Sequence, residues 1–401
     1  MANSVTRVTS QGWGSRLGGS IVGALVGVGL AVAAVALLFW NEGRAVKRAR
    51  TLAEGAGAVV SVSADAVAAG HEGKLVHVGG NATTTETLRD PLFGIADNAL
   101  ALERKVDMYQ WTQKEERHER KKLGGGTETV TTYTYQTEWQ GSPVDSARFE
   151  QSGGHENPAF PFPAEKWRAE DVRLGAFQLA PELARGLDHS ETLAVGEAQL
   201  TGVAPELQGR LKAADGGFYL GAAPGAPKVG DVRVRFGVVR PAQASVVAAQ
   251  RGSRLEPYRA QAGGEIALVE YGAKSAEQMF QSARNANTAL TWVLRLVGFV
   301  LLFAGIANVL RPLRVFADVV PFVGRLVGGG IALVAFLIAA PVALLTVAAG
   351  WLIYRPVLGV ALIVVAVALV VWLVRRSRKR LPAAPVATFV PPPPPPPVPA
   401  T

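Results

Sequence analysis

The sequence predicts a multi-pass α-helical membrane protein with four transmembrane helices and a large extracytoplasmic β-rich α+β domain between helices 1 and 2. Two observations predict this class. Four stretches are apolar and long enough to cross the roughly 30 Å hydrocarbon core of a bilayer. The about 250 residues between the first and second stretches contain alternating, β-rich runs and are enough to bury a sizeable core.

The first predicted span covers residues 21–40, which contain no charged residue, and follows a short cytoplasmic N-terminus at residues 1–20. About 20 residues at about 1.5 Å each are enough for one crossing. A cleaved signal peptide is the alternative, because Arg7 and Arg16 make a basic region before the apolar run. The run is longer than the apolar core of a signal peptide and Trp40 begins a poor cleavage site, so we expect a retained anchor.

Three further spans are predicted near the C-terminus. The second span carries Arg295 in its first turn, where a long side chain can reach the headgroups. Arg355 and Pro356 separate the last two spans, which must form a tight hairpin. The predicted segments are helix 2 at residues 292–310, a cytoplasmic loop at 311–325, helix 3 at 326–354, helix 4 at 357–374, and a basic, then proline-rich disordered cytoplasmic tail at 375–401.

The distribution of Lys and Arg sets the predicted orientation. Four spans put both termini on one side, and more basic residues flank the membrane on that side than on the other. The side of the termini is therefore predicted to be cytoplasmic and residues 41–291 extracytoplasmic, in one or two subdomains. The formal net charge of +9 gathers at these flanking positions, so we expect contact with membrane lipids and no binding of nucleic acid.

The extracytoplasmic segment is predicted to be rich in strands. The clearest signal is a hairpin of residues 100–113 and 127–139, joined by a polar connection at 114–126. Its alternation would set aromatic side chains opposite one another, and we interpret them as sheet packing rather than as a ligand platform. Residues 153–163 are expected to be irregular. Further strands are predicted at 73–80, 229–239, 245–255 and 265–271, and a helix at 275–289 that continues into the second span.

The chemistry-bearing residues do not form the pattern of an enzyme. The chain has no cysteine, which excludes disulfides, a thiolate nucleophile and a cysteine-based zinc site. The five histidines are scattered; His155 beside Glu156 is the most suggestive pair, and we interpret it as part of a structural loop. No nucleophile elbow, P-loop or dinucleotide fingerprint is present. We therefore expect no catalytic residue, no metal site and no cofactor.

Three groups of residues at the membrane are candidate sites. Gly19, Gly23 and Gly27 have the spacing of close helix packing, the alternative being a merely glycine-rich composition. A charge cluster at one membrane surface is predicted for Glu42, Arg295 and Arg355, the alternative being three charges that extend separately into water. A basic run is predicted to bind anionic headgroups, and it consists of Arg375, Arg376, Arg378, Lys379 and Arg380.

Several motifs resemble one known family. The segments NEGRA (41–45), EGKLVH (72–77), DMYQW (107–111), YTYQTEW (133–139) and TVAAGWLIYRP (346–356) occur in the order found in the LUMA family, transmembrane protein 43. The resemblance implies the same arrangement of spans and domain, and self-association. For the animal members it implies residence in the endoplasmic reticulum and inner nuclear membrane and a scaffold role with emerin and lamins. The Ala-, Gly-, Val- and Arg-rich composition and the proline run at 391–397 depart from that pattern and look bacterial, so lamin and emerin binding are not expected.

We therefore expect an integral membrane scaffold that organises protein complexes through its extracytoplasmic domain and self-association, without catalysis. The alternatives are a channel or transporter component and a membrane-anchored periplasmic hydrolase. A channel predicts a polar lining at oligomer interfaces, and a hydrolase predicts a pocket with convergent titratable groups. The expected location is the bacterial inner membrane. The expected partners are membrane lipids, further copies of the chain, and unidentified membrane or extracytoplasmic proteins.

Overall fold

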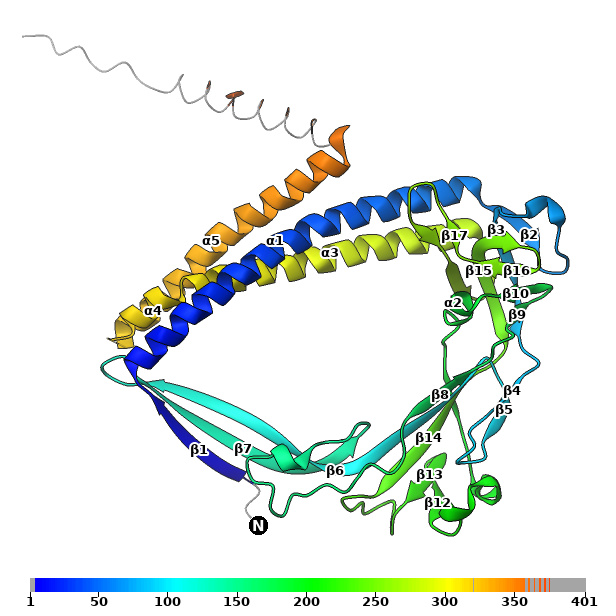
Figure 1. Cartoon of the computed structure of the whole chain (residues 1–401), viewed down its shortest axis with the longest axis horizontal. Coiled ribbons are helices and arrows are strands. Elements are labelled where there is room, and N and C mark those ends of the chain that lie inside the picture. The colour runs from blue at the N-terminus through cyan, green and yellow to red at the C-terminus, as the bar shows by residue number, and fades with distance from the viewer. Residues whose placement is uncertain are drawn as a thin grey trace, which may run out of the picture. The chain divides into compact units, whose positions relative to one another are not determined.

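A computed structural model describes residues 4–319 and 321–357 and the single positions 360, 364, 368, 371, 372 and 375. The chain divides into two compact units, Met1–Val347 and Ala348–Thr401, and the fold described here is that of the first. The helices are α1 (Trp13–Ala58), α2 (Pro181–Ala184), α3 (Ala276–Val309), α4 (Arg311–Ala317) and α5 (Pro321–Tyr354), the last of which continues into the second unit (Figure 1).

Three helices are long and apolar enough to cross a membrane: α1, α3 and the Gly329–Tyr354 part of α5. They contain the first three predicted spans, and α1 and α3 each continue as helix into polar sequence beyond the predicted span. The predicted helix at 275–289 is the first part of α3, which Ser275 caps through its hydroxyl and Gln278. The predicted loop at 311–325 is partly helical, since it contains α4. Apart from isolated positions, the fourth predicted span lies outside the described residues.

The helices α1 and α3 lie side by side along much of their length (Figure 1). A small apolar cluster joins Leu38 of α1, Leu302 of α3 and Ala339 of α5. Many other apolar side chains face outward, among them Leu25 and Leu296, which are 70% and 63% exposed. So much apolar surface is stable in contact with lipid acyl chains and costly in water. These helices therefore define an integral membrane protein.

The β-rich domain contains two main sheets. One has the order β1-β7-β6-β14-β13-β12, with β8 paired to β6 and β11 to β14. The other has the order β19-β15-β16-β10-β9-β3-β2, and β15 also pairs with β3. The strands of the first sheet are β1 (Ser4–Gln11), β6 (Ala101–Lys121), β7 (Thr127–Gln140), β8 (Glu165–Arg168), β11 (Glu191–Leu193), β12 (Leu211–Ala214), β13 (Gly217–Leu220) and β14 (Val232–Val239). Those of the second are β2 (Val60–Ser63), β3 (Leu75–Thr83), β9 (Arg173–Leu174), β10 (Phe177–Leu179), β15 (Ala242–Arg251), β16 (Arg254–Glu256) and β19 (Leu268–Tyr271).

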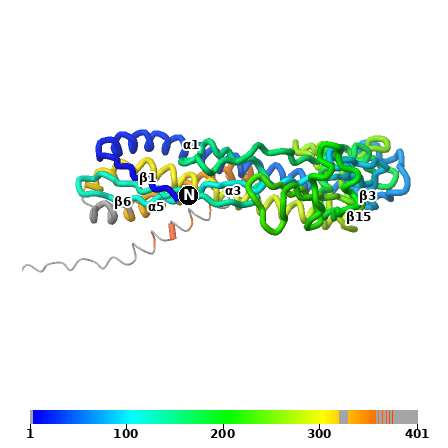
Figure 2. Tube along the Cα trace, turned by 90° about the horizontal axis from the view of Figure 1, so that it is seen from below, coloured from blue at the N-terminus to red at the C-terminus, as the bar shows by residue number. Residues whose placement is uncertain are grey.

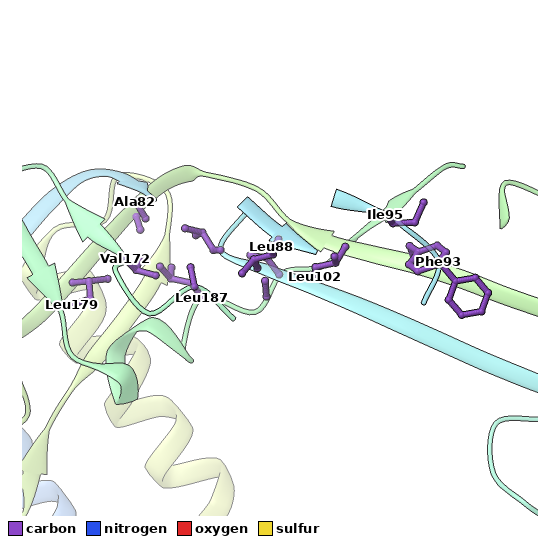
Figure 3. Packing of buried hydrophobic residues seen from close by; sticks show 14 of the residues in the cluster. Ala82, Leu88, Phe93, Ile95, Leu102, Val172, Leu179 and Leu187 are labelled. Carbon is purple, nitrogen blue, oxygen red and sulfur yellow. The ribbon is translucent and has the colours of Figure 1, made fainter. Parts of the chain in front are cut away.

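Two short hairpins complete the domain, β4 (Thr87–Arg89) with β5 (Ala96–Asn98) and β17 (Tyr258–Arg259) with β18 (Glu265–Ile266). The main hydrophobic core draws side chains from both sheets and from the connection after β4 (Figure 3). Phe93 is fully buried there, with its ring centroid 5.9 Å from that of Phe218 and 5.4 Å from that of Phe162. This core keeps the two sheets together as one domain.

The predicted hairpin is confirmed, but it is longer than expected. Strand β6 continues to Lys121, so the polar segment that was predicted to connect the two arms is mostly strand. Most of the β7 residues opposite these charged residues are Thr, Val and Tyr, which favour the strand conformation. Tyr109 pairs with Trp139, as the alternation predicted, with ring centroids 5.3 Å apart.

The N-terminal segment differs from the prediction. Strand β1 pairs with β7 along its whole length, from Ser4 opposite Thr134 to Gln11 opposite Thr127. Figure 2 shows β1 and β6 at one end of the unit, near the start of α1, and β3 and β15 at the other. Paired strands of an open sheet must lie on one side of a bilayer, because unsatisfied backbone groups are costly in hydrocarbon. The predicted assignment of residues 1–20 and 41–291 to opposite sides does not agree with this pairing.

Candidate functional site at the helix pair

A buried ion pair joins α1 to α3. The guanidinium of Arg295 donates from Nε to Oε1 of Glu42 over 2.8 Å and from Nη2 to Oε2 over 2.9 Å. The side chains are 17% and 3% exposed, and the guanidinium also lies 4.8 Å from the ring centroid of Trp292. A two-bond pair fixes both the separation and the relative rotation of the helices. The structure thus brings together two members of the predicted charge cluster.

A second layer of polar contacts extends this pair. Arg44 donates to the side-chain oxygens of Asn287 and Thr291, both over 3.0 Å, and to that of Asn41. The amide of Asn41 donates to the Thr291 carbonyl over 3.1 Å, and that of Asn287 donates to the Ala45 carbonyl over 3.1 Å. Sequence reasoning missed Asn287 and Thr291. The available signal was the helical spacing that puts Asn287, Thr291 and Arg295 on one face of α3.

The predicted glycine face is only partly used for helix packing. A Cβ added to Gly27 would lie 2.6 Å from the Gly305 carbonyl oxygen, so the backbones of α1 and α3 are in close contact there. Gly23 faces the side chain of Arg311, with Nη1 3.7 Å from the position of such a Cβ. Gly19 has no neighbour within 4 Å of that position among the described residues. The close contact needs glycine at position 27 and not at position 19.

The remaining predicted site residues lie in the second unit. Arg355 follows α5, and its backbone N–H donates to the Trp351 carbonyl over 2.8 Å. Arg375 is described only as an exposed helical position. The rest of the predicted headgroup-binding run, Arg376, Arg378, Lys379 and Arg380, lies outside the described residues, as does the proline-rich tail.

The polar ends of α1 and α3 are built into the β-rich domain. Leu52 of α1 and Met279 and Phe280 of α3 form a buried cluster with Ile266. A Cβ on Gly55 would lie 2.3 Å from the terminal methyl of Ile266, so α1 approaches this side chain closely. The carboxylate of Glu54 accepts the backbone N–H groups of residues 261 and 262 over 2.8 and 2.9 Å. The membrane helices and the domain therefore form one continuous packed structure.

A second ionic contact lies at the opposite end of α1. Asp318 is fully buried and accepts from Nη2 of Arg16 over 2.7 Å and from Nζ of Lys121, at the tip of the β6–β7 hairpin. Burial alone would raise the pKa of the Asp318 carboxyl, but the hydrogen bonds and charges of Lys121 and Arg16 outweigh it and hold that pKa below its usual value. Trp13 adds a hydrogen bond from its indole N–H to the Val315 carbonyl over 3.1 Å. We call these contacts the hairpin clasp; its side chains are those of Trp13, Arg16, Lys121 and Asp318.

The aromatic residues of the hairpin are packed within the domain. His155 is buried, with its ring 4.0 Å from the Tyr135 centroid in a stacked arrangement and 4.8 Å from that of Trp111. Its Nδ1 lies 3.1 Å from the Gln151 carbonyl. Within the described part of the chain, no group of three or more His, Cys, Asp or Glu residues is placed to hold a metal ion. These contacts hold the loop after β7 against the sheet.

Comparison with known proteins agrees with this class of integral membrane protein. The family profile "Transmembrane protein 43" matches residues 108–356. The mouse and human proteins named Transmembrane protein 43 are each 36% identical to this chain, over 386 and 385 residues, which is 93% of this chain and 94% of each relative. The Drosophila melanogaster homolog is 32% identical over 364 residues, 88% of this chain and 94% of its own length. No solved structure matches. The chain belongs to the transmembrane protein 43 family, which confirms the resemblance seen in its motifs.

Proposed function

We propose that this protein is a membrane-anchored scaffold that organises protein complexes through its β-rich domain and through self-association. The observation that carries the proposal is the continuity between the apolar helices and the domain. Helices α1 and α3 run from their apolar segments into the cluster around Leu52 and Phe280, and the Glu42–Arg295 pair fixes them to each other. A domain attached in this way presents its surfaces at a fixed orientation to the membrane, as a scaffold requires.

Strand β1 supports a site of self-association. It is the outer strand of its sheet, and no strand among the described residues pairs with its free edge. Val8 on this strand is 59% exposed. A free edge offers a row of backbone donors and acceptors to another strand, and two copies can pair their β1 strands antiparallel around a twofold axis.

Crosslinking in native membranes tests this proposal, because the chain has no cysteine of its own. A single cysteine at Thr6, on β1, is compared with one at Thr201, an exposed position in the 3-10 helix Glu197–Gly202 of the same domain. A short bismaleimide should give a crosslinked dimer with Thr6→Cys and much less with Thr201→Cys. Mass spectrometry of the other crosslinked products identifies partner proteins.

Two outcomes count against the scaffold. One is a monomer by light scattering in detergent together with no crosslinked product for either cysteine. The other is ion flux through reconstituted vesicles that depends on the protein, which favours the channel alternative. A dimer that forms equally with both cysteines refutes the assignment to β1.

A further inference from the structure

A basic pocket lies where the hairpin clasp meets the ends of the membrane helices. Its volume is about 440 Å³, and its walls come from the start of α1, the end of β6, the junction of α3 with α4, and the part of α5 before Ala348. Four cationic side chains line it, Arg16, Lys121, Arg311 and Arg314. Figure 1 shows these elements converging at one end of the unit.

The charges in this pocket are not balanced. Asp318 and Glu119 are its acidic lining residues, so four cations face two carboxylates, a formal excess of +2. Asp318 is already shared by Arg16 and Lys121. Arg311 and Arg314 are exposed, and neither forms an ion pair within the described part of the chain. Two guanidinium groups thus remain available to an anion.

Part of the pocket wall is apolar. It consists of Ala304 and Ala307 of α3 and Ile331 and Ala332 of α5. This wall continues directly into the apolar surface of the membrane helices, because the apolar run of α3 ends immediately before Arg311. The side chain of Arg311 lies against α1, with Nη1 3.7 Å from the position of a Cβ on Gly23.

We propose that this pocket binds the phosphate-bearing headgroup of an anionic membrane lipid, with an acyl chain along its apolar wall. Guanidinium groups bind phosphate oxygens in pairs of parallel hydrogen bonds, and basic pockets between membrane helices are suited to anionic headgroups. A zwitterionic headgroup adds a positive choline group to a site with excess positive charge. The pocket therefore selects phosphatidylglycerol over phosphatidylcholine. The lipid would also contact the clasp that joins the N-terminus, the hairpin and α4.

Binding is measured on the purified full-length protein in a neutral detergent, by thermal shift and by native mass spectrometry. The probes are short-chain phosphatidylglycerol, short-chain phosphatidylcholine and inorganic phosphate. We expect phosphatidylglycerol to bind about tenfold more tightly than phosphatidylcholine, because the positive choline group is repelled by the excess positive charge of the pocket. The double variant Arg311→Gln/Arg314→Gln should reduce phosphatidylglycerol binding by about tenfold or more and abolish the preference.

The matched control is Arg89→Gln/Arg210→Gln, which removes the same charge from two exposed positions of the β-rich domain. It should bind phosphatidylglycerol as the unmodified protein does. Equal affinities for the two lipids, or equal losses in both double variants, overturn the proposal. If inorganic phosphate alone stabilises the protein as much as phosphatidylglycerol does, the lipid assignment is overturned and the pocket is a site for free phosphate. The far-UV circular dichroism of both variants reports whether they are folded, and the exposure of all four arginines predicts that they are.

Discussion

Replacing Gly27 by leucine should separate α1 from α3. An added Cβ would lie 2.6 Å from the Gly305 carbonyl oxygen and 2.9 Å from both the Asn308 Cβ and the Val309 nitrogen, whereas ordinary contact begins at 3.4 Å. The helices would have to move apart by about 0.8 Å to accept even alanine. Neighbouring atom contacts that open by this distance lose about a quarter to a half of their dispersion energy. Overpacking of this kind costs about 1–3 kcal/mol, and leucine needs more room than alanine.

Gly19 provides the matched control on the same helix. No described atom lies within 4 Å of the Cβ position there, so Gly19→Leu adds apolar surface without a clash. The gain in helix propensity over glycine is up to about 1 kcal/mol at either position, so it cancels in the comparison. The expected order of stability is Gly19→Leu equal to or above the unmodified protein, then Gly27→Ala, then Gly27→Leu.

The measurement is thermal unfolding of the purified protein in detergent, followed by intrinsic fluorescence at a fixed heating rate. Gly305→Ala is the reciprocal variant, since its Cβ would lie 2.8 Å from both the Ala31 nitrogen and the Gly27 carbonyl oxygen, and it should resemble Gly27→Ala. Equal unfolding temperatures for Gly27→Leu and Gly19→Leu would falsify the predicted contact. The glycines would then reflect the glycine-rich composition of the chain rather than close packing of α1 against α3.

Three further predictions concern charge and topology. Glu42→Gln or Arg295→Gln alone should destabilise the protein by about 3–5 kcal/mol, because each removes one partner of a largely buried ion pair, and the double variant should cost less than the sum. Additive losses in thermal unfolding would reject the coupling. The depressed pKa of Asp318 means that the clasp contributes fully above the ordinary carboxyl pKa of about 3.9 and is lost as the pH falls through the folded-state value. Unfolding temperatures measured between pH 3 and 7 should therefore fall less steeply on the acid side for Asp318→Asn, and parallel curves would contradict this. Single cysteines at Thr9 and Leu123 should react with an impermeant maleimide from the same side of the membrane, because β1 pairs with β7, and labelling from opposite sides would rule out that pairing.

Features that depend on local pattern were predictable from the sequence. Three of the four apolar runs fall on helices, and simple alternation predicts that aromatic side chains of the two hairpin arms share one face, as Tyr109 and Trp139 do. The Glu42–Arg295 pair could also be anticipated, because both residues lie at span ends that are predicted to be at the same membrane surface and therefore at the same depth. That these three helices cross the membrane, and that a fourth span follows them, remain predictions.

Features that depend on distant contacts were not predictable. Trp13 and Val315, and likewise Arg16 and Asp318, are separated by 302 positions in the chain. Strand β1 has only a weak apolar alternation, so its pairing with β7 cannot be recognised from its own eight residues. The orientation was predicted from Lys and Arg counts without this strand, and the assignment of sides remains a prediction. The glycine spacing alone could not show that Gly27 meets the last turn of α3 whereas Gly23 meets Arg311 and Gly19 meets no described residue.

The length of the β6–β7 hairpin follows from the contact at its tip. Strand β6 has 21 residues and α1 has 46, so at about 3.3 Å and 1.5 Å per residue each extends for about 69 Å. Only an extended chain covers that distance with so few residues, which is why the charged residues before Lys121 are strand rather than loop. Little apolar burial supports that part of the strand, since its side chains are largely exposed. The interactions of Lys121 and Arg16 with Asp318, together with the pairing of β1 to β7, therefore stabilise it, and loss of the clasp should first loosen the end of the hairpin while the core around Phe93 remains folded.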